Sequence, residues 1–400
     1  MLLPSPLHRS SRPMSFDSSA PPNDGRVALF ADRFLPYSQT FIYEELRAHE
    51  RYAVDVFCKE RLNADRFPYD RVTHPTTWIG QRVYENVGYW PRFDRLLGRG
   101  GYDLLHAHFG TTAVYALPYV LRHDLPFVIT FWGNDVSVLL GTQRYNPKNW
   151  RYLALRQTIM DRADLMLCVS RELAEFVREL SGRPEAIEVW SHGIDLDRFH
   201  PVEHENEVPS VVMVGRFTEK KGHGYALRAF ANAIDAGHEA HLTLIGDGER
   251  RARCRDWARA LGIDDRVTFA GVLSPDEVAG HLARADVALV PSVVARNHDR
   301  EGSPTVAKEA AACGVPVVAT YHAGLPEIVD DEETGLLVPE RNVDALTDAL
   351  RRLLDDAALR RRLGRAARAK MERAFELHAQ VETLERYYDQ IRRDAPAPPR

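Results

Sequence analysis

The chain of 400 residues is longer than a single hydrophobic core usually organises, so two domains of ordinary size are expected. Hydrophobic residues make up 44% and charged residues 27% of it, which is typical of a folded globular protein and excludes a disordered or collagen-like chain. The 57 Asp and Glu residues outnumber the 52 Lys and Arg residues, and the net charge of -5 gives no reason to expect nucleic acid as a partner.

The ends of the chain predict two tails. The apolar start is interrupted by Pro4 and Pro6, so it lacks the continuous apolar segment of a signal peptide, and residues 1–24 are expected to be disordered. Residues 394–400 are rich in proline and predict a frayed end. The four cysteines stand far apart without a Cys-x-x-Cys pair, as reduced core thiols do, and no apolar run approaches the roughly 20 residues of a membrane-spanning helix. We therefore expect a cytoplasmic protein, at most peripheral to the inner face of the plasma membrane.

In the first half of the chain, short runs rich in β-branched residues alternate with longer helical patterns. Such alternation is typical of a parallel sheet whose strands are joined by crossover helices. It predicts a Rossmann-like domain over residues 25–205. The predicted strands are Arg26–Ala31, Ala53–Cys58, Leu104–His108, Pro126–Trp132, Leu165–Ser170 and Ala186–His192.

The same alternation restarts after Pro201–Pro209, a polar stretch with almost nothing to bury and therefore the best candidate for a linker. A second Rossmann-like domain is predicted over residues 206–376, followed by a helix over 377–393 that crosses back to the first domain. The fold class is thus α/β, with two doubly wound domains that face each other across a cleft. The strands of the second set are Ser210–Gly215, Leu242–Gly246, Val267–Gly271, Val287–Pro291, Pro316–Thr320 and Leu336–Val338.

The strongest functional motif follows the strand Val287–Pro291, at the strand end where doubly wound sheets bind ligands. Glu301 and Glu309 are separated by seven residues, with a Gly-Ser-Pro turn between them. Pro304 predicts a helix start at which the amides of Thr305 and Val306 point outward, and such a helix N-terminus binds anions. Glu309 is then placed to accept hydrogen bonds from hydroxyls of a ligand whose phosphate lies at the helix tip.

A second motif opens the second domain, where the strand Ser210–Gly215 leads into Arg216–Gly222. The turn at Gly215 brings backbone close to a ligand, and Arg216 and Lys221 present two cations to one site. Each charge-assisted bond to a diphosphate would contribute roughly 1.5–3 kcal/mol. Such a pair can hold a diphosphate leaving group without a metal.

Three other patterns carry weaker signals. Gly246–Arg251 follows a strand like a dinucleotide fingerprint, but its third glycine is absent, which argues against a dehydrogenase. Asp195 and Asp197 resemble an Asp-x-Asp metal motif, although plain loop acids fit their position better. The sixteen histidines show no His-Glu-x-x-His or comparable ligand spacing, so no metal site is predicted.

Together, the Arg216–Gly222 loop, the Glu301-x7-Glu309 motif and the strand after Gly314 resemble glycosyltransferase family 4. The resemblance extends over most of the chain from about Arg26 to Leu354. It implies the GT-B fold and a retaining transferase that uses a nucleotide sugar. Phe34–Ile42 and His106–Gly110 narrow the resemblance to the branch that builds colanic acid and other bacterial exopolysaccharides.

The resemblance also implies the roles of the second-domain residues. Arg216 and Lys221 would bind the diphosphate, Glu309 the ribose hydroxyls and Glu301 the transferred hexose. Backbone groups would contact sugar and phosphate. The donor-binding residues implied are Gly215, Arg216, Lys221, Gly246, Gly302, Ser303, Pro304, Thr305, Val306 and Glu309, and Glu301, Arg216 and Lys221 are also the catalytic candidates of this domain.

The first domain departs from the family at one position. Relatives commonly show a His-Gly-x-Asp turn where this chain has Trp132-Gly-Asn-Asp135. His108 and Asp135 are therefore the catalytic candidates of this domain, with His106 as a neighbour of His108. The remaining candidates form an acceptor side and are Ser38, Gln39, Thr40, His106 and Trp132.

These inferences predict a metal-independent, retaining hexosyltransferase with no cofactor. Its donor would be a UDP- or GDP-linked sugar. Its acceptor would be a glycan, in lipid-linked form, of an exopolysaccharide or lipopolysaccharide. Two alternatives stay open. A nucleotide-sugar 2-epimerase would share the fold but needs a pair of acids flanking the sugar, and a non-catalytic nucleotide-sugar-binding protein would fit the substitution at Trp132.

The stretch Arg82–Gly101 mixes arginines with aromatic residues, a composition suited to an anionic membrane surface. It also contains Pro91, Glu85 and Asp94. A helix packed on the sheet through its aromatic residues, with solvated arginines, explains it equally well. We keep weak association with an anionic membrane as a prediction.

Overall fold

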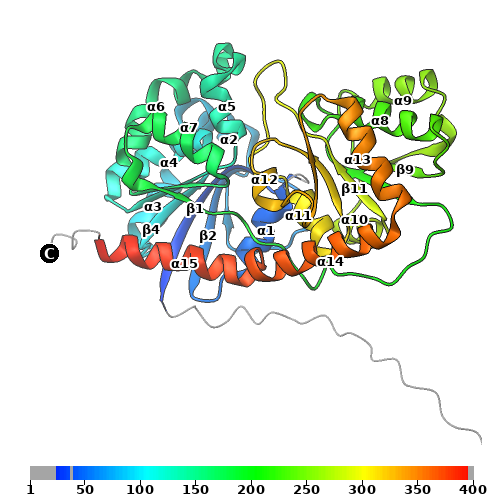
Figure 1. Ribbon diagram of the computed structural model, residues 1–400. Helices are drawn as coiled ribbons and strands as arrows, with labels where there is room; N and C mark the ends of the chain where they lie inside the picture. The colour runs from blue at the N-terminus through cyan, green and yellow to red at the C-terminus, as the bar shows by residue number, and fades with distance from the viewer. Residues whose placement is uncertain (1–23, 37–38, 395–400) are drawn as a thin grey trace, which may run out of the picture.

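The computed structural model describes residues 24–36 and 39–394, which form two α/β units side by side (Figure 1). Of the predicted tails, only Asp24 and Asp394 fall in these ranges, and Ser38 lies outside them. Each unit is built on one parallel sheet, and the switch from one sheet to the next falls between residues 189 and 210.

The first sheet has seven described strands in the order β3-β2-β1-β4-β5-β6-β7, all parallel. The order reverses between β1 and β4, as in other doubly wound sheets. Six of these strands were predicted, whereas β3 has two residues and is too short to carry a periodic pattern. The strands are β1 (Gly25–Phe34), β2 (Tyr52–Arg61), β3 (Val72–Thr73), β4 (Leu104–His108), β5 (Phe127–Phe131), β6 (Leu165–Cys168) and β7 (Ile187–Val189).

The second sheet contains all six predicted strands, in the order β10-β9-β8-β11-β12-β13. The order reverses between β8 and β11, so the loops after these two strands lie at the switch point where such sheets bind ligands. The strands are β8 (Ser210–Val214), β9 (His241–Ile245), β10 (Val267–Gly271), β11 (Val287–Val290), β12 (Val317–Thr320) and β13 (Gly335–Val338).

Helices cover both faces of the first sheet, and its core is a single apolar cluster. Side chains cap some of the helix ends. At the start of α7 (Arg171–Ser181), for example, the Ser170 hydroxyl accepts a hydrogen bond from the Leu173 N–H. The helices are α1 (Thr40–Ala48), α2 (Trp78–Val87), α3 (Pro91–Arg99), α4 (Gly110–His123), α5 (Asn134–Leu140), α6 (Trp150–Arg162) and α7 (Arg171–Ser181).

The second sheet separates two apolar clusters, one on each face. Ser274 and Glu277 form a capping box at the start of one of its helices. The helices are α8 (His223–Asp235), α9 (Arg251–Ala260), α10 (Pro275–Ala283), α11 (Thr305–Ala312), α12 (Leu325–Ile328), α13 (Val343–Asp355) and α14 (Ala357–Ala374).

The last helix, α15 (Leu377–Asp394), returns to the first unit, as predicted (Figure 1). Leu384, Tyr388 and Ile391 belong to the core of that unit, and Glu385 accepts hydrogen bonds from the backbone after α1. The chain therefore crosses between the units twice. No helix in the described part is both long and apolar enough to span a membrane.

Candidate functional site

The two units meet through loops that follow the carboxyl ends of their strands. We call this region the junction. A Cβ atom added at Gly302 would lie 2.3 Å from the Trp132 carbonyl oxygen, and one at Gly133 would lie 3.0 Å from the Glu301 carbonyl oxygen. Only glycine therefore lets the loop after β11 approach the loop after β5 this closely.

Side chains also join the units at the start of α11. Ser303 Oγ lies 3.1 Å from Ser191 Oγ, and Thr305 Oγ1 lies 3.1 Å from His192 Nε2. Lys308, fully buried on α11, donates hydrogen bonds to Ser191 Oγ at 2.7 Å and to the His192 carbonyl at 2.8 Å. Its burial lowers its pKa well below the ordinary value. Sequence analysis missed Lys308, whose place between two apolar helix positions gave no sign of a polar partner.

The N-terminus of α11 is the predicted anion cradle. Pro304 occupies the N-cap position, and no described residue accepts a hydrogen bond from the N–H groups of Thr305 or Val306. These two donors add to the positive end of the helix dipole. The tip of α11 can therefore bind a phosphate group.

Lys221 and Glu301 lie beside this cradle as an ion pair, with Lys221 Nζ 3.1 Å from Glu301 Oε1. Burial alone would raise the pKa of Glu301, but the cations of Lys221 and Lys220 lower it to about 2. Lys220 points elsewhere and binds Asp299 Oδ1 at 3.1 Å and the Arg300 carbonyl at 3.0 Å. The adjacent lysines thus divide their roles, since Lys220 holds the loop before Glu301 and Lys221 pairs with its carboxylate.

Two further residues orient Glu301 from behind. The Glu301 N–H donates to His322 Nε2 at 3.2 Å, so this nitrogen must be the acceptor and the proton resides on Nδ1. His322 Nδ1 in turn donates to Glu340 Oε1 at 2.6 Å. Burial would raise the pKa of Glu340, but the hydrogen bonds from His322 and Val294 lower it. Sequence analysis missed His322 and Glu340, although both follow strands of the second sheet at the edge where ligands bind.

Glu309 lies further along α11 as a partly buried residue, and no hydrogen bond joins its carboxylate to a described residue. Burial raises its pKa to about 7, despite the opposing effect of Lys221, Arg198 and Lys308. The raised pKa and the lack of a hydrogen-bonding partner make Glu309 a candidate binding residue.

The turn after β8 carries the other predicted cation. Arg216 is exposed and has no ion pair with any described residue, so its guanidinium is free to bind an anion. The stem of Lys221 lies against Gly215, where an added Cβ would come within 3.2 Å of Lys221 Cδ. Gly246 has φ +130° and supports the same turn, because a Cβ there would lie 2.2 Å from the Gly215 carbonyl oxygen. A direct contact of Gly246 with a donor stays a prediction.

Asp135 is fully buried and organises the loop after β5. Its carboxylate accepts hydrogen bonds from the N–H groups of Gly110, Trp132, Gly133 and Val136. Burial raises its pKa, although these four bonds act in the opposite direction. Asp135 thus holds the backbone of the loop after β5 in place. Its direct participation in catalysis stays a prediction.

The histidines predicted beside it are also interior. His106 and His108 are fully buried on β4, beneath Trp132, whose ring lies 5.8 Å from that of His108. Trp132 itself reaches the junction, with its ring 5.3 Å from that of His192. Gln39 and Thr40 begin α1. Of the acceptor-side candidates, Trp132 therefore lies at the junction. His106 and His108 lie deeper in the first unit, on the other side of the Trp132 ring, so a substrate contact by His108 stays a prediction.

Two doubly wound parallel sheets that meet at their carboxyl ends, with a helix of the second unit crossing back to the first, define the GT-B architecture. The family model described as "Glycosyl transferases group 1" matches residues 197–370, and the one described as "Glycosyltransferase Family 4" matches residues 40–198. The chain belongs to glycosyltransferase family 4, as its motifs predicted.

Curated relatives agree with this membership. WcaL of Escherichia coli, named as a colanic acid biosynthesis glycosyltransferase, is 33% identical over 62% of this chain, and the match spans only 60% of its own length. AmsK of Erwinia amylovora, named for amylovoran biosynthesis, is 31% identical over 69% of this chain and 67% of its own. A GDP-mannose-dependent phosphatidylinositol monomannoside mannosyltransferase of Mycobacterium tuberculosis is 27% identical over 90% of this chain and 93% of its own.

Solved structures support the fold. Sucrose-phosphate synthase from Thermosynechococcus elongatus superimposes with a TM-score of 0.74 at 24% identity, over 92% of this chain and 99% of its own. HepE from Anabaena, solved in complex with UDP and glucose, gives a TM-score of 0.74 at 17% identity, over 92% of this chain and 100% of its own. The GT-B prediction is confirmed.

Proposed function

We propose that the protein transfers a hexose, with retention of configuration, from a nucleoside diphosphate sugar to a glycan acceptor in exopolysaccharide or lipopolysaccharide synthesis. The observation that carries this proposal is the Lys221–Glu301 ion pair beside the free amides of α11. Its Lys221 Nζ and Glu301 Oε1 atoms are 3.1 Å apart. A cation and a helix N-terminus suit a diphosphate, and a carboxylate suits sugar hydroxyls.

In the proposed reaction, Arg216, Lys221 and the tip of α11 hold the diphosphate and stabilise the charge that develops on it as the glycosidic bond breaks. Glu301, held by His322, orients the hexose. The acceptor hydroxyl approaches the same face of the sugar and passes its proton to the departing phosphate oxygen, so no protein nucleophile is needed. The protein acts mainly by positioning two substrates and requires no metal for this step.

The names of related proteins support the substrate class without fixing the base. The mycobacterial relative is named for GDP-mannose and phosphatidylinositol monomannoside, and HepE was solved with UDP and glucose. We propose a UDP- or GDP-linked donor and a lipid-linked acceptor at the cytoplasmic face of the membrane.

A screen of nucleotide sugars for slow hydrolysis tests the proposal without an acceptor. We expect one UDP- or GDP-sugar to release its nucleotide and free hexose. Conversion of the donor into its 2-epimer would identify an epimerase instead, and tight binding without any turnover would identify a binding protein.

We further expect hydrolysis to continue when EDTA is present in the assay. Asp195 Oδ1 accepts hydrogen bonds from the N–H groups of Asp197 and Arg198, so it already serves as the cap of its own loop. Loss of activity that Mg²⁺ or Mn²⁺ restores would contradict metal-independent transfer and point to these acids.

Membrane contact is proposed through α2 and α3. Phe93 and Leu97 are buried in the core, as the packed-helix interpretation requires, but the arginines of α3 are exposed. In the preceding helix, α2, Trp78 is 71% and Ile79 is 67% exposed, and Val83 and Val87 are exposed as well. A segment that exposes both apolar side chains and cations has the composition of a surface that binds anionic lipid.

We therefore expect weak, salt-sensitive binding to anionic vesicles, measured by sedimentation. Changing Arg92, Arg95 and Arg99 together to Gln should remove roughly 1 kcal/mol of attraction per cation. The matched control changes three exposed arginines of the second unit, which are Arg351, Arg361 and Arg365. Equal loss in both triple variants, or no binding at low salt, would contradict a specific surface on the first unit.

A further inference from the structure

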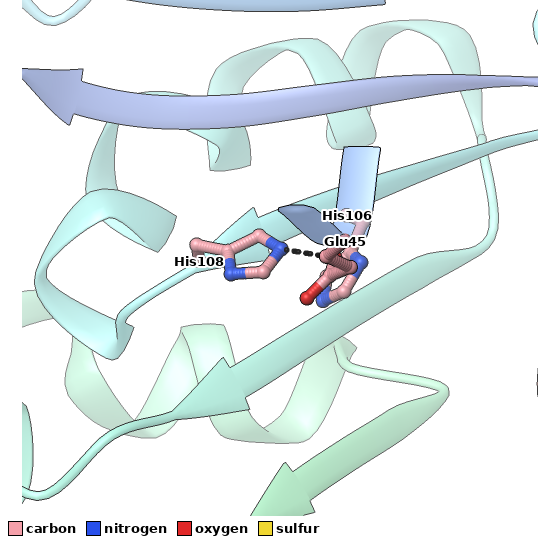
Figure 2. Close-up of side chains that lie close together, drawn as sticks. All are labelled: Glu45, His106 and His108. Carbon is pink, nitrogen blue, oxygen red and sulfur yellow. Dashed lines mark ion pairs between the residues drawn. The ribbon is translucent and has the colours of Figure 1, made fainter. Parts of the chain in front are cut away.

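A cluster of three ionisable side chains lies inside the first unit, behind Trp132 and apart from the donor-binding residues. Glu45 comes from α1, and His106 and His108 come from β4 (Figure 2). Each residue offers one nitrogen or oxygen atom, and these atoms all lie within 4.8 Å of one another. Because side chains two residues apart on a strand share a face, the His-x-His spacing directs both imidazoles toward Glu45.

The cluster is almost completely buried, and its polar atoms are poorly satisfied. Glu45 is 1% exposed and the two histidines are 0% exposed. His108 Nε2 lies 3.1 Å from Glu45 Oε1, the distance of an ion pair, but its angles do not make a hydrogen bond. Neither carboxylate oxygen of Glu45 and neither ring nitrogen of His108 has a hydrogen-bonding partner among the described residues. Four such atoms in one place are costly unless a ligand satisfies them.

His106 differs because both of its nitrogens have partners. Nδ1 lies 2.7 Å from the Tyr388 hydroxyl, and Nε2 lies 2.7 Å from Thr130 Oγ1. If one nitrogen of His106 exchanges its hydroxyl partner for a metal ion, the other nitrogen keeps its own hydroxyl partner. That remaining hydrogen bond fixes the orientation of the ring. This second hydrogen bond is a regular feature of histidines that bind metals.

We propose that Glu45, His106 and His108 bind one divalent transition-metal ion of the zinc type. Two imidazoles and one carboxylate form a ligand set that zinc accepts, and a divalent cation compensates the buried carboxylate. Three protein ligands leave one coordination position for a water molecule, and the ring of Trp132, which packs against His108, lies between the cluster and the junction.

The first experiment measures the metal in the full-length protein. Protein expressed with zinc in the medium and dialysed against a metal-free buffer should retain zinc in stoichiometric amount by mass spectrometry. Glu45→Gln and His108→Gln should each lose it. His123→Gln is the matched control, since His123 pairs with Asp94 outside the cluster in the same unit and should leave the zinc content unchanged.

The second experiment does not depend on whether these variants fold. Cobalt bound to the wild-type protein should give a visible spectrum without thiolate charge-transfer bands, because none of the four buried cysteines belongs to the cluster. Wild-type protein stripped by a chelator under mild denaturation should regain several degrees in Tm when zinc returns. Tyr388→Phe and Thr130→Val each remove one hydroxyl partner of His106, and the variant that removes the partner of the non-ligating nitrogen should weaken zinc binding about 10-fold to 100-fold.

Absence of metal from dialysed wild-type protein, together with a Tm that zinc does not change, would overturn the proposal. The cluster would then be an imidazolium–carboxylate pair or would hold a buried water molecule. A thiolate band in the cobalt spectrum would likewise overturn it, by placing the metal at a cysteine.

Discussion

Replacing Lys221 with Ala is expected to reduce kcat/KM for the donor about 100-fold or more, with most of the loss in kcat. Lys221 Nζ lies 3.1 Å from Glu301 Oε1 beside the tip of α11, where the charge of a departing diphosphate would develop. Removal of one preorganised group that stabilises developing charge typically costs about 10²-fold to 10³-fold in rate. The measurement is steady-state donor hydrolysis or transfer.

Two controls separate this effect from a loss of fold. Lys148→Ala removes a lysine exposed on the first unit and should leave kcat/KM unchanged. Lys221→Ala combined with Glu301→Gln removes the unpaired buried carboxylate, so it should restore any Tm lost in the single variant without restoring turnover. Unchanged kinetics in Lys221→Ala would remove Lys221 from the donor site.

The fold was predictable because it depends on local patterns, and the same kind of pattern indicated the residues that we propose for donor binding. Each strand of the second sheet is a short apolar run bounded by turn residues, and parallel sheets place the ends of such runs at one edge. The Glu301–Glu309 spacing spans one turn and one helix start, so no long-range packing had to be known. Lys221 and Glu301 are far apart in the chain, and it was the resemblance to family 4 that implied a common donor for them.

The supporting residues were not predictable because their partners lie far away in the chain. His322 and Glu340 follow different strands and meet only when β12 and β13 pair. Glu45 meets His108 across the fold from α1 to β4. The absence of a short metal motif therefore said nothing about a cluster assembled by the topology.

Substitution of Glu309 is expected to change both the affinity for the nucleotide and the stability of the folded protein. Glu309→Ala should weaken the affinity for the nucleotide about tenfold or more, because hydrogen bonds from ribose hydroxyls to a charged acceptor contribute roughly 1.5–3 kcal/mol. Isothermal titration with UDP and GDP measures this change. Unaltered affinity for both nucleotides would contradict the assignment of Glu309 to the ribose.

The same carboxylate should lower stability at neutral pH. A Glu carboxyl titrates at about 4.3 in an unfolded chain, and burial raises the pKa of Glu309 in the folded protein to about 7. The folded state holds this proton more tightly, so the associated stability is present below the unfolded pKa and is lost as the pH rises through 7. Glu309→Gln removes the titration, and its advantage in free energy of unfolding should grow by roughly 1–3 kcal/mol between about pH 5 and pH 8. Urea unfolding at several pH values measures it. If the difference in free energy of unfolding between Glu309→Gln and the wild type stays constant with pH, the Glu309 carboxylate ionises in the folded protein at little cost. That result would contradict the raised pKa from which this prediction starts.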